Sequence, residues 1–359
     1  MKYYPWVSST FCDIIHNNIN ITWDSSSLLI QVNAENMFFQ DYEMDFTDLY
    51  KSCELCPRAC GVDRTDTRNR KAIGFCGETD QVRVAHVGPH FGEEPPITGT
   101  RGSGTVFFSG CSLRCNFCQN HQISLGGMGE TFSSNQLLEK IRRMILNNRV
   151  HNVNFVTPDH FIPHTVGVVS HLKTEHPDFP ILYNVSGYQS VNVLRHLERY
   201  ADMYLPDFKY SDTALAKKLS GCADYPGKAM DAISEMVRQK GFLNAAISGD
   251  ELATQGVLVR HLILPGAVLN SINALTTLFV EFGPGLPISL MSQYHPVVHL
   301  EEPELNRAIT DQEFEKVHDH ANQLGFNHMF VQFPEVSVES ALDDPSFLPD
   351  FKKREPFHK

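Results

Sequence analysis

The sequence predicts an α/β protein, a partial (βα)6-type TIM barrel preceded by a cysteine-rich N-terminal extension. Two observations lead to this prediction. From residue 105 onward, short apolar runs alternate with amphipathic stretches of roughly 10–15 residues, which is typical of parallel strands connected by helices. About six such units follow one another, and such a series fits a complete or partial barrel better than an open sheet.

Each strand is expected where a short run is rich in β-branched or aromatic residues. These runs cover residues 105–110, 152–157, 180–186, 202–208, 256–264, 287–294 and 328–333, and a shorter alternating run at 81–87 precedes them. The helices are expected at 133–148, 163–175, 190–200, 270–282 and 310–324, with further helical segments up to residue 241. The first of these helices has Ser133 or Ser134 as its N-cap and one apolar stripe from Leu137 to Ile145.

These elements divide the chain into four expected segments. Residues 1–50 form an N-terminal extension without an assigned role, in which 28–32 has the character of a strand. Residues 51–100 are the cysteine-rich segment, residues 101–335 the barrel, and residues 336–359 a C-terminal tail.

The charge balance excludes several classes of protein. The 359 residues include 30 Lys and Arg against 42 Asp and Glu, a formal charge of −12, which argues against nucleic-acid binding because that relies on a basic excess. No apolar run approaches the ~18 residues of a membrane span, and the first residues lack the order of a signal peptide. We therefore expect a cytoplasmic protein with neither a nucleic-acid nor a membrane partner.

Three cysteines lie close together after the first barrel strand, in the spacing C-x3-C-x2-C at Cys111, Cys115 and Cys118. A structural zinc site or an ordinary four-iron cluster uses four ligands, and no fourth cysteine follows nearby. Three thiolates on a [4Fe–4S] cluster leave one iron open to another ligand. The alternatives are a zinc site completed by His121, or three free thiols.

A second group of cysteines precedes the barrel at positions 53, 56, 60 and 76. Cys53, Cys56, Cys60 and Cys76 are compatible with a closed zinc or iron–sulfur site, which would serve as an electron relay or a structural clasp, and also with free thiols. The remaining two cysteines, Cys12 and Cys222, are expected to be small buried residues.

Polar residues follow several barrel strands, where the active sites of such barrels lie. They are Thr157, Pro158 and Asp159 after the second strand, Asn184 and Ser186 at the third, Asp207 and Lys209 at the fourth, Arg260 in the fifth and His295 after the sixth. This set suits S-adenosylmethionine (SAM) bound to an open iron. Backbone carbonyls and Asp159 would take its ammonium, Asn184, Ser186 and Asp207 its ribose, and Lys209 or Arg260 its carboxylate.

These motifs resemble the radical SAM superfamily, and within it the glycyl-radical-enzyme activases typified by pyruvate formate-lyase activating enzyme ([formate-C-acetyltransferase]-activating enzyme). The chain is most similar to the related PflX-like family. That similarity rests on the cysteine segments 53–61 and 108–120, Gly-Glu-Glu-Pro-Pro at 92–96, Tyr-Asn-Val-Ser-Gly-Tyr at 183–188, Tyr-Leu-Pro-Asp-Phe-Lys-Tyr at 204–210 and Met-Ser-Gln-Tyr-His at 291–295.

The resemblance implies roles for individual residues. Cys111, Cys115 and Cys118 would ligate a [4Fe–4S] cluster, Phe117 and Gln119 would lie near the adenine, and Asp207, Lys209, Arg260 and His295 would match positions at the SAM site. Thr157-Pro158-Asp159 stands where activases have Gly-Gly-Glu; proline lacks the N–H but keeps its carbonyl.

The expected activity is that of a radical SAM oxidoreductase, which cleaves SAM to a 5′-deoxyadenosyl radical that abstracts hydrogen. The resemblance implies a glycyl radical enzyme as partner and flavodoxin or ferredoxin as electron donor. The alternatives are a radical SAM enzyme acting on a small molecule, and a non-catalytic zinc-binding interaction protein. Glu93 and Glu94 are interpreted as a solvated turn, Asp207 and Lys209 alternatively as a plain ion pair, and His295 alternatively as a loop histidine.

Overall fold

The computed structural model describes residues 19–24, 27–32, 46–66, 73–245, 251–334 and 348–357. The chain divides into two units, residues 1–45 and 46–359. In the first unit, β1 (Ile19–Asp24) and β2 (Ser27–Val32) form an antiparallel hairpin. Cys12 lies outside the described residues. No helix in the described part of the chain has the length and apolar character needed to span a membrane.

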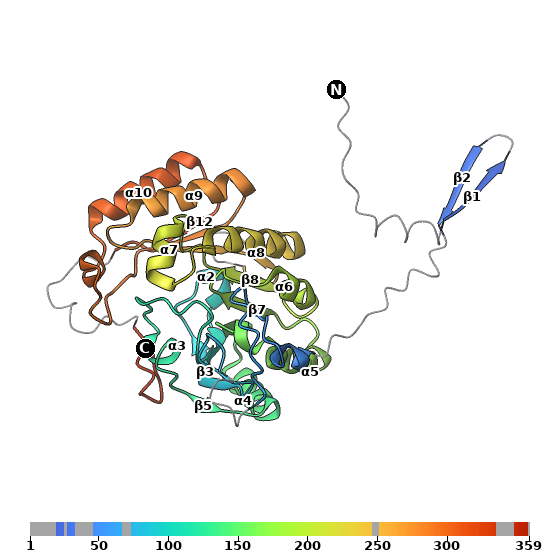
Figure 1. The fold of residues 1–359 in the computed structure, drawn as a ribbon, viewed down its shortest axis with the longest axis horizontal. Coiled ribbons are helices and arrows are strands. Elements are labelled where there is room, and N and C mark those ends of the chain that lie inside the picture. Colours follow the sequence, from blue (N-terminus) through green and yellow to red (C-terminus); the bar gives the residue numbers. More distant parts are fainter. Residues whose placement is uncertain are drawn as a thin grey trace. The chain divides into compact units, whose positions relative to one another are not determined.

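The second unit is built on a mostly parallel sheet, and the predicted α/β partial barrel is confirmed (Figure 1). Its parallel strands are β4 (Ser103–Phe108), β6 (Val153–Val156), β7 (Ile181–Val185), β8 (Met203–Pro206), β9 (Gly256–Val257), β10 (Val259–Leu262), β11 (Ile288–Met291) and β12 (Met329–Val331). β3 (Arg83–His90) and β5 (Glu130–Thr131) are antiparallel strands at one edge.

The barrel is held together between β8 and β10 by a single bridge. Asp207 pairs with Arg260 in parallel, and the N–H of Phe208 donates to the carbonyl of Arg260 at 2.8 Å. The edge strands β5 and β12 are not paired with each other in the described residues. The strands therefore curve into an open barrel rather than a closed one.

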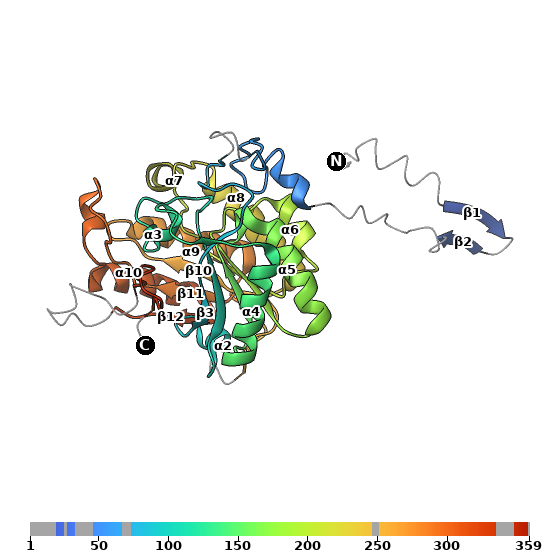
Figure 2. The same cartoon turned by 90° about the horizontal axis from the view of Figure 1, so that it is seen from below.

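Helices cover the outside of the strands. They are α4 (Ser134–Asn148), α5 (Ile162–Glu175), α6 (Val191–Leu197), α7 (Thr213–Ser220), α8 (Tyr225–Lys240), α9 (Val268–Phe282) and α10 (Asp311–Leu324). The remaining helical segments are the short helices α2 (Pro95–Thr98), which packs inside the barrel, and α3 (His121–Ser124), and the 3-10 turns Phe46–Tyr50, Asp159–Phe161 and Pro303–Asn306. Figure 2 shows α4, α5 and α6 along one outer side of the sheet. The Ser133 side chain caps α4 in a capping box with Gln136.

The core has two faces because strand side chains alternate. On the outer face, aromatic rings of neighbouring strands pack in a row, Phe155 on Tyr183 at 5.5 Å and Tyr183 on Tyr204 at 6.2 Å between centroids. On the inner face, Leu182, Met203 and Leu205 pack against Ile97 of α2, a smaller apolar cluster inside the barrel. This packing fixes the strand ends from which the polar site residues project.

Candidate active site

The three-cysteine segment is a loop that leaves the end of β4 through a sharp turn at Gly110. Gly110 has φ +77°, and a Cβ there would lie 2.5 Å from Cγ of Glu78 and 2.8 Å from the carbonyl oxygen of Cys76, so only glycine fits. Short turns continue the loop: the Cys118 N–H donates to the carbonyl of Cys115 at 3.3 Å. All three thiols line one cavity of about 2210 Å³.

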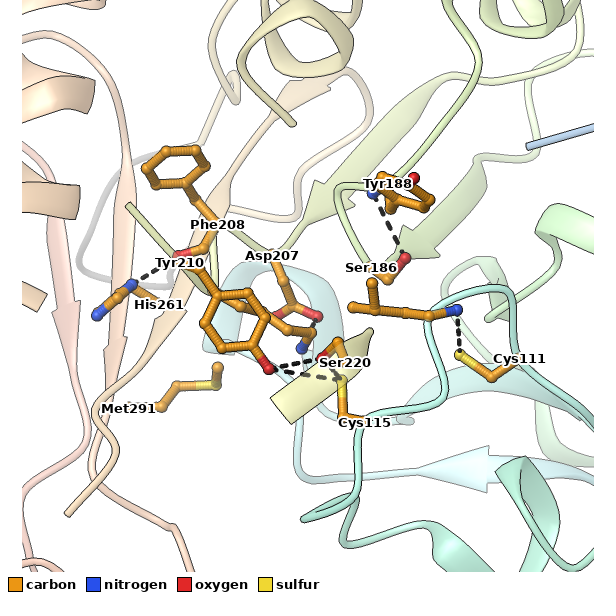
Figure 3. Close-up of polar contacts among 12 residues, drawn as sticks. Cys111, Cys115, Ser186, Tyr188, Asp207, Phe208, Tyr210, Ser220, His261 and Met291 are labelled. Carbon is orange, nitrogen blue, oxygen red and sulfur yellow. Dashed lines mark hydrogen bonds and ion pairs between the residues drawn. The ribbon is translucent and has the colours of Figure 1, made fainter. Parts of the chain in front are cut away.

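Hydrogen bonds hold the sulfurs of Cys111 and Cys115 in place (Figure 3). The Cys115 sulfur accepts from the Ser220 hydroxyl at 3.0 Å and lies 3.9 Å from the Tyr210 hydroxyl, while Cys111 Sγ accepts from the Leu113 N–H at 3.3 Å. Burial, and next the nearby Cys115, raises the pKa values of Cys111 and Cys118. The three thiols therefore lie near one another, and metal binding would have to displace their protons.

The three thiols are not arranged around a single metal ion. Among the described residues, no three His, Cys, Asp or Glu side chains are grouped so that they could hold one metal ion. Thiolates around one tetrahedral zinc, with Zn–S of about 2.3 Å, stand roughly 3.8 Å apart. A [4Fe–4S] cluster binds each thiolate to a different iron and needs a wider spacing. The zinc site completed by His121 thus has no support in the geometry.

Most of the residues predicted to hold the first cluster and SAM line the same cavity, and three do not. Those that line it come from the cysteine loop and from the ends of β6, β7, β8 and β10: Cys111, Cys115, Phe117, Cys118, Gln119, Thr157, Asn184, Ser186, Asp207, Lys209 and Arg260. Pro158, Asp159 and His295 are not among the lining residues. The cavity therefore brings together residues from four strand ends.

Asp207 and Lys209 form a partly buried ion pair just after β8, with Lys209 Nζ 2.6 Å from Asp207 Oδ2. Burial alone would lower the pKa of Lys209, but the charges of Asp207 and Cys115 outweigh it and raise that pKa. Lys209 is thus a fixed positive charge that faces the cysteine loop.

Tyr225, which the sequence did not single out, ties two strand ends together. Its hydroxyl lies 2.9 Å from the carbonyl oxygens of Ser186 and of Asp207, and it accepts the N–H of Lys209 at 2.9 Å. At Gly187, φ is +81° and a Cβ would lie 2.1 Å from the Asp207 carbonyl oxygen. This close approach of β7 and β8 requires glycine.

Arg260 does not have the free guanidinium that the sequence predicted for a SAM carboxylate. Its Nε donates to Glu94 Oε1 at 2.9 Å, and its Nη2 contacts both Glu93 and Glu94. The interpretation of these glutamates as a solvated turn was wrong, because their side chains are only 6% and 8% exposed. Burial would raise the pKa of Glu94, but Arg260 lowers it. The triad adds a net charge of −1 to the cavity wall.

Asp159 lies in a separate, mostly apolar recess beneath α5 and α6. Its Oδ1 accepts from Gln189 Nε2 at 2.6 Å, and burial raises its pKa to about 6. Thr157 has φ +55°, and the chain then continues into the 3-10 turn that carries Asp159 away from the cavity. His295 is half-buried, and burial lowers its pKa. An ammonium group in the large cavity would therefore meet Thr157, not Asp159.

A part of the predicted C-terminal tail also lines the cavity, a contact that was not predicted. Residues 348–357 run across β3 and β4, with Phe351 and Phe357 packed on Phe107 at ring distances of 5.6 and 5.1 Å. The Phe351 N–H donates to Gln122 Oε1 at 2.7 Å. Aromatic residues in a short terminal segment are the only signal that pointed to this contact.

The four-cysteine segment packs directly on the three-cysteine loop. The Cys111 N–H donates to the carbonyl of Cys76 at 3.2 Å. The Arg58 guanidinium donates to the carbonyls of Ser112, Leu113, Ser220 and Gly221. Cys222 is buried, as expected, and does not line the cavity.

Comparisons with known proteins found one family model and several similar chains. Residues 105–248 match the model of the Radical SAM superfamily. The uncharacterized protein MJ0674 of Methanocaldococcus jannaschii is 26% identical over 323 residues, which cover 83% of this chain and 86% of that protein. The solved structure of methylornithine synthase (PylB) aligns at a TM-score of 0.40 and 15% identity over 69% of this chain and 75% of its own. Streptococcus suis SuiB bound to precursor peptide SuiA aligns at 0.41 and 10%, over 66% and 53%.

Proposed function

We propose that this chain is a radical SAM oxidoreductase that acts on a glycyl radical enzyme. Residues 105–248 match the model of the radical SAM superfamily, and that superfamily implies a [4Fe–4S] cluster and SAM. The observation that carries the proposal is the cavity that the three-cysteine loop shares with the polar ends of β6, β7 and β8. Cys111, Cys115 and Cys118 would hold the cluster. When bound, the reduced cluster supplies the electron that cleaves SAM to methionine and a 5′-deoxyadenosyl radical.

The chain's own residues would bind and orient SAM. Asn184 and Ser186 offer hydrogen-bonding groups for the ribose, and the backbone carbonyl of Thr157 offers an acceptor for the ammonium. Lys209 would be the cation for the carboxylate rather than Arg260, because its single pair with Asp207 is neutral overall, whereas Arg260 is paired with two glutamates and its group is negative. Phe117 offers a ring for the adenine, while burial of the surrounding residues excludes water from a reactive radical.

The size of the cavity supports a protein substrate. Pockets for small ligands enclose about 300–1,000 Å³, whereas this cavity encloses about 2210 Å³. Space therefore remains beside SAM for a backbone loop whose glycine Cα–H would give up its hydrogen atom. A small-molecule substrate is the second candidate, and it would leave much of this volume to water or to a lid.

The experiment is anaerobic reconstitution of the full chain, followed by reduction with dithionite in the presence of SAM. We expect methionine and 5′-deoxyadenosine to form. Cys115→Ala should abolish cleavage, and Cys222→Ala, which removes a buried thiol that does not line the cavity, should retain it. Equal cleavage by wild type and Cys115→Ala would refute the assignment.

The choice of substrate needs a separate measurement. A glycyl radical enzyme with deuterated glycine is mixed with the reduced protein, with flavodoxin or ferredoxin as electron donor. Deuterium in the 5′-deoxyadenosine and a glycyl radical signal in the EPR spectrum are expected. SAM cleavage without deuterium transfer to the nucleoside would exclude that partner and favour a small molecule.

A further inference from the structure

Arg64 presents an unbalanced charge inside the protein. Its side chain is 0% exposed, and a guanidinium stays protonated at any physiological pH. Removing a cation from water costs several kcal/mol unless an anion lies beside it. The residues around Arg64 should therefore show what anion the site contains.

Two neutral carbonyls accept hydrogen bonds from Arg64, but they do not balance its charge. Nη1 donates to the carbonyl of His160 at 2.7 Å, Nη2 donates to the carbonyl of Thr79 at 2.5 Å, and Nε has no partner. Among the described residues no carboxylate lies within ion-pair distance of Arg64; Glu78 is paired with Arg83 at 3.7 Å. The counter-charge must come from another kind of group.

Beside the rings of Tyr50 and Phe161, which lie 4.7 and 5.6 Å from its guanidinium carbon, Arg64 has two thiols as neighbours. Nη1 lies 3.7 Å from the Cys53 sulfur. A Cβ placed on Gly74 would lie 3.2 Å from the Cys76 sulfur and 3.6 Å from Cδ of Arg64, so these two side chains border the same glycine. Cys53, Cys56 and Cys76 are all buried.

The fourth cysteine joins this group through the backbone. Cys60 Sγ accepts the N–H of Phe75, the residue before Cys76, at 3.3 Å. Turn hydrogen bonds keep the other half of the segment compact, from the Gly61 N–H to the carbonyl of Cys53 at 3.1 Å and from the Ala59 N–H to that of Cys56 at 3.0 Å. The hydrogen bond from the Phe75 N–H to Cys60 Sγ is of the kind that accompanies metal-bound thiolates.

We propose that Cys53, Cys56, Cys60 and Cys76 hold a second [4Fe–4S] cluster and that Arg64 is its buried counter-ion. Four thiolates around a core of charge +2 give a net charge of −2, which supplies the missing anion. Zinc with four thiolates has the same charge, and the metal count below distinguishes the two. The position beside the three-cysteine loop favours a cluster, because a cluster there could relay electrons to that loop. It would neighbour the first one, since Cys76 and Cys111 share a backbone hydrogen bond of 3.2 Å.

The test counts metal in the anaerobically reconstituted full chain. We expect about eight irons and eight sulfides per chain in the wild type. A variant with Cys111→Ala, Cys115→Ala and Cys118→Ala should keep about four irons and an EPR signal that SAM does not change. Loss of all iron from that variant, or one zinc per chain in place of those four irons, would overturn the proposal. The iron count does not depend on SAM cleavage, so a failure of this proposal can be distinguished from a failure of the proposed function.

The role of Arg64 is tested by redox titration of the second cluster in the same variant, which lacks the three cysteines of the loop. Arg64→Gln removes a positive charge beside the cluster, so the reduction potential of the cluster should become more negative. Arg64→Lys keeps the charge, so the potential should stay close to that of the variant with Arg64. Arg195→Gln, at an exposed position on α6, is the control and should leave the potential unchanged. If Arg64→Gln does not fold, Arg64→Lys and the iron counts still decide. An unchanged potential in Arg64→Gln would refute its role.

Discussion

The buried triad of Arg260, Glu93 and Glu94 leads to a quantitative prediction for Arg260→Gln. The three side chains are 11%, 6% and 8% exposed. Breaking a buried ion pair by removing one partner costs about 3–5 kcal/mol. An independent calculation gives a similar value: if one stranded carboxyl takes up a proton, its ordinary pKa of about 4.3 sets a cost of about 3.7 kcal/mol at pH 7.

The same reasoning predicts how the loss depends on pH. In the wild type the pKa of Glu94 is lowered, so its contribution is present above the unfolded pKa and is lost only in acid. In Arg260→Gln the pKa of a stranded carboxyl is raised, and stability is lost as the pH rises above about 4.3. At pH 5 the cost of protonation falls to about 1 kcal/mol. The gap between wild type and variant should therefore shrink by about 3 kcal/mol from pH 7 to pH 5.

The measurement is urea unfolding followed by circular dichroism under anaerobic conditions at both pH values. Arg142→Gln is the matched control, because Arg142 pairs with Glu175 on the surface and should contribute about 0–1 kcal/mol. Glu94→Gln combined with Arg260→Gln should recover part of the loss. A gap that does not change with pH, or a variant that loses SAM affinity at wild-type stability, would refute the reasoning.

Three further predictions concern neighbouring sites. Burial raises the pKa of Asp159 to about 6, so its carboxyl destabilises the fold as the pH rises from about 4 to about 6. Asp159→Asn should therefore raise the free energy of unfolding by up to about 3 kcal/mol at pH 7, and should not raise it at pH 4. A gain of equal size at both pH values in urea unfolding would contradict this. Gly187→Ala should lower the free energy of unfolding by more than about 1 kcal/mol. Gly167→Ala on α5, where a Cβ would have nothing within 4 Å, should raise it by about 0.5–1 kcal/mol in the same assay. Equal effects of the two substitutions would contradict the steric explanation. Ser220→Ala removes a hydrogen bond to Cys115 Sγ at 3.0 Å, so a redox titration should find the cluster at a more negative potential, and an unchanged potential would speak against Cys115 as a ligand.

Local sequence was enough to predict the barrel. The helix predicted at 133–148 is α4, Ser134–Asn148, and the strand predicted at 180–186 is β7, Ile181–Val185. Capping residues and hydrophobic periodicity act over a few residues and can be recognised in a sequence. The run predicted as one strand at 256–264 is two, β9 and β10, since its first half pairs with β8 and its second half with β11.

Two features of the site could likewise be recognised in the sequence, because both depend on chain connectivity. They are the spacing of three cysteines within eight residues and the position of polar residues after parallel strands. The partners of those polar residues could not be recognised in this way. Arg260 meets Glu94 across 166 positions of the chain, and the Arg64 side chain contacts the thiol of Cys53 and borders the same glycine as that of Cys76. Which charge a buried side chain faces depends on how distant segments pack, and only the tertiary structure determines that.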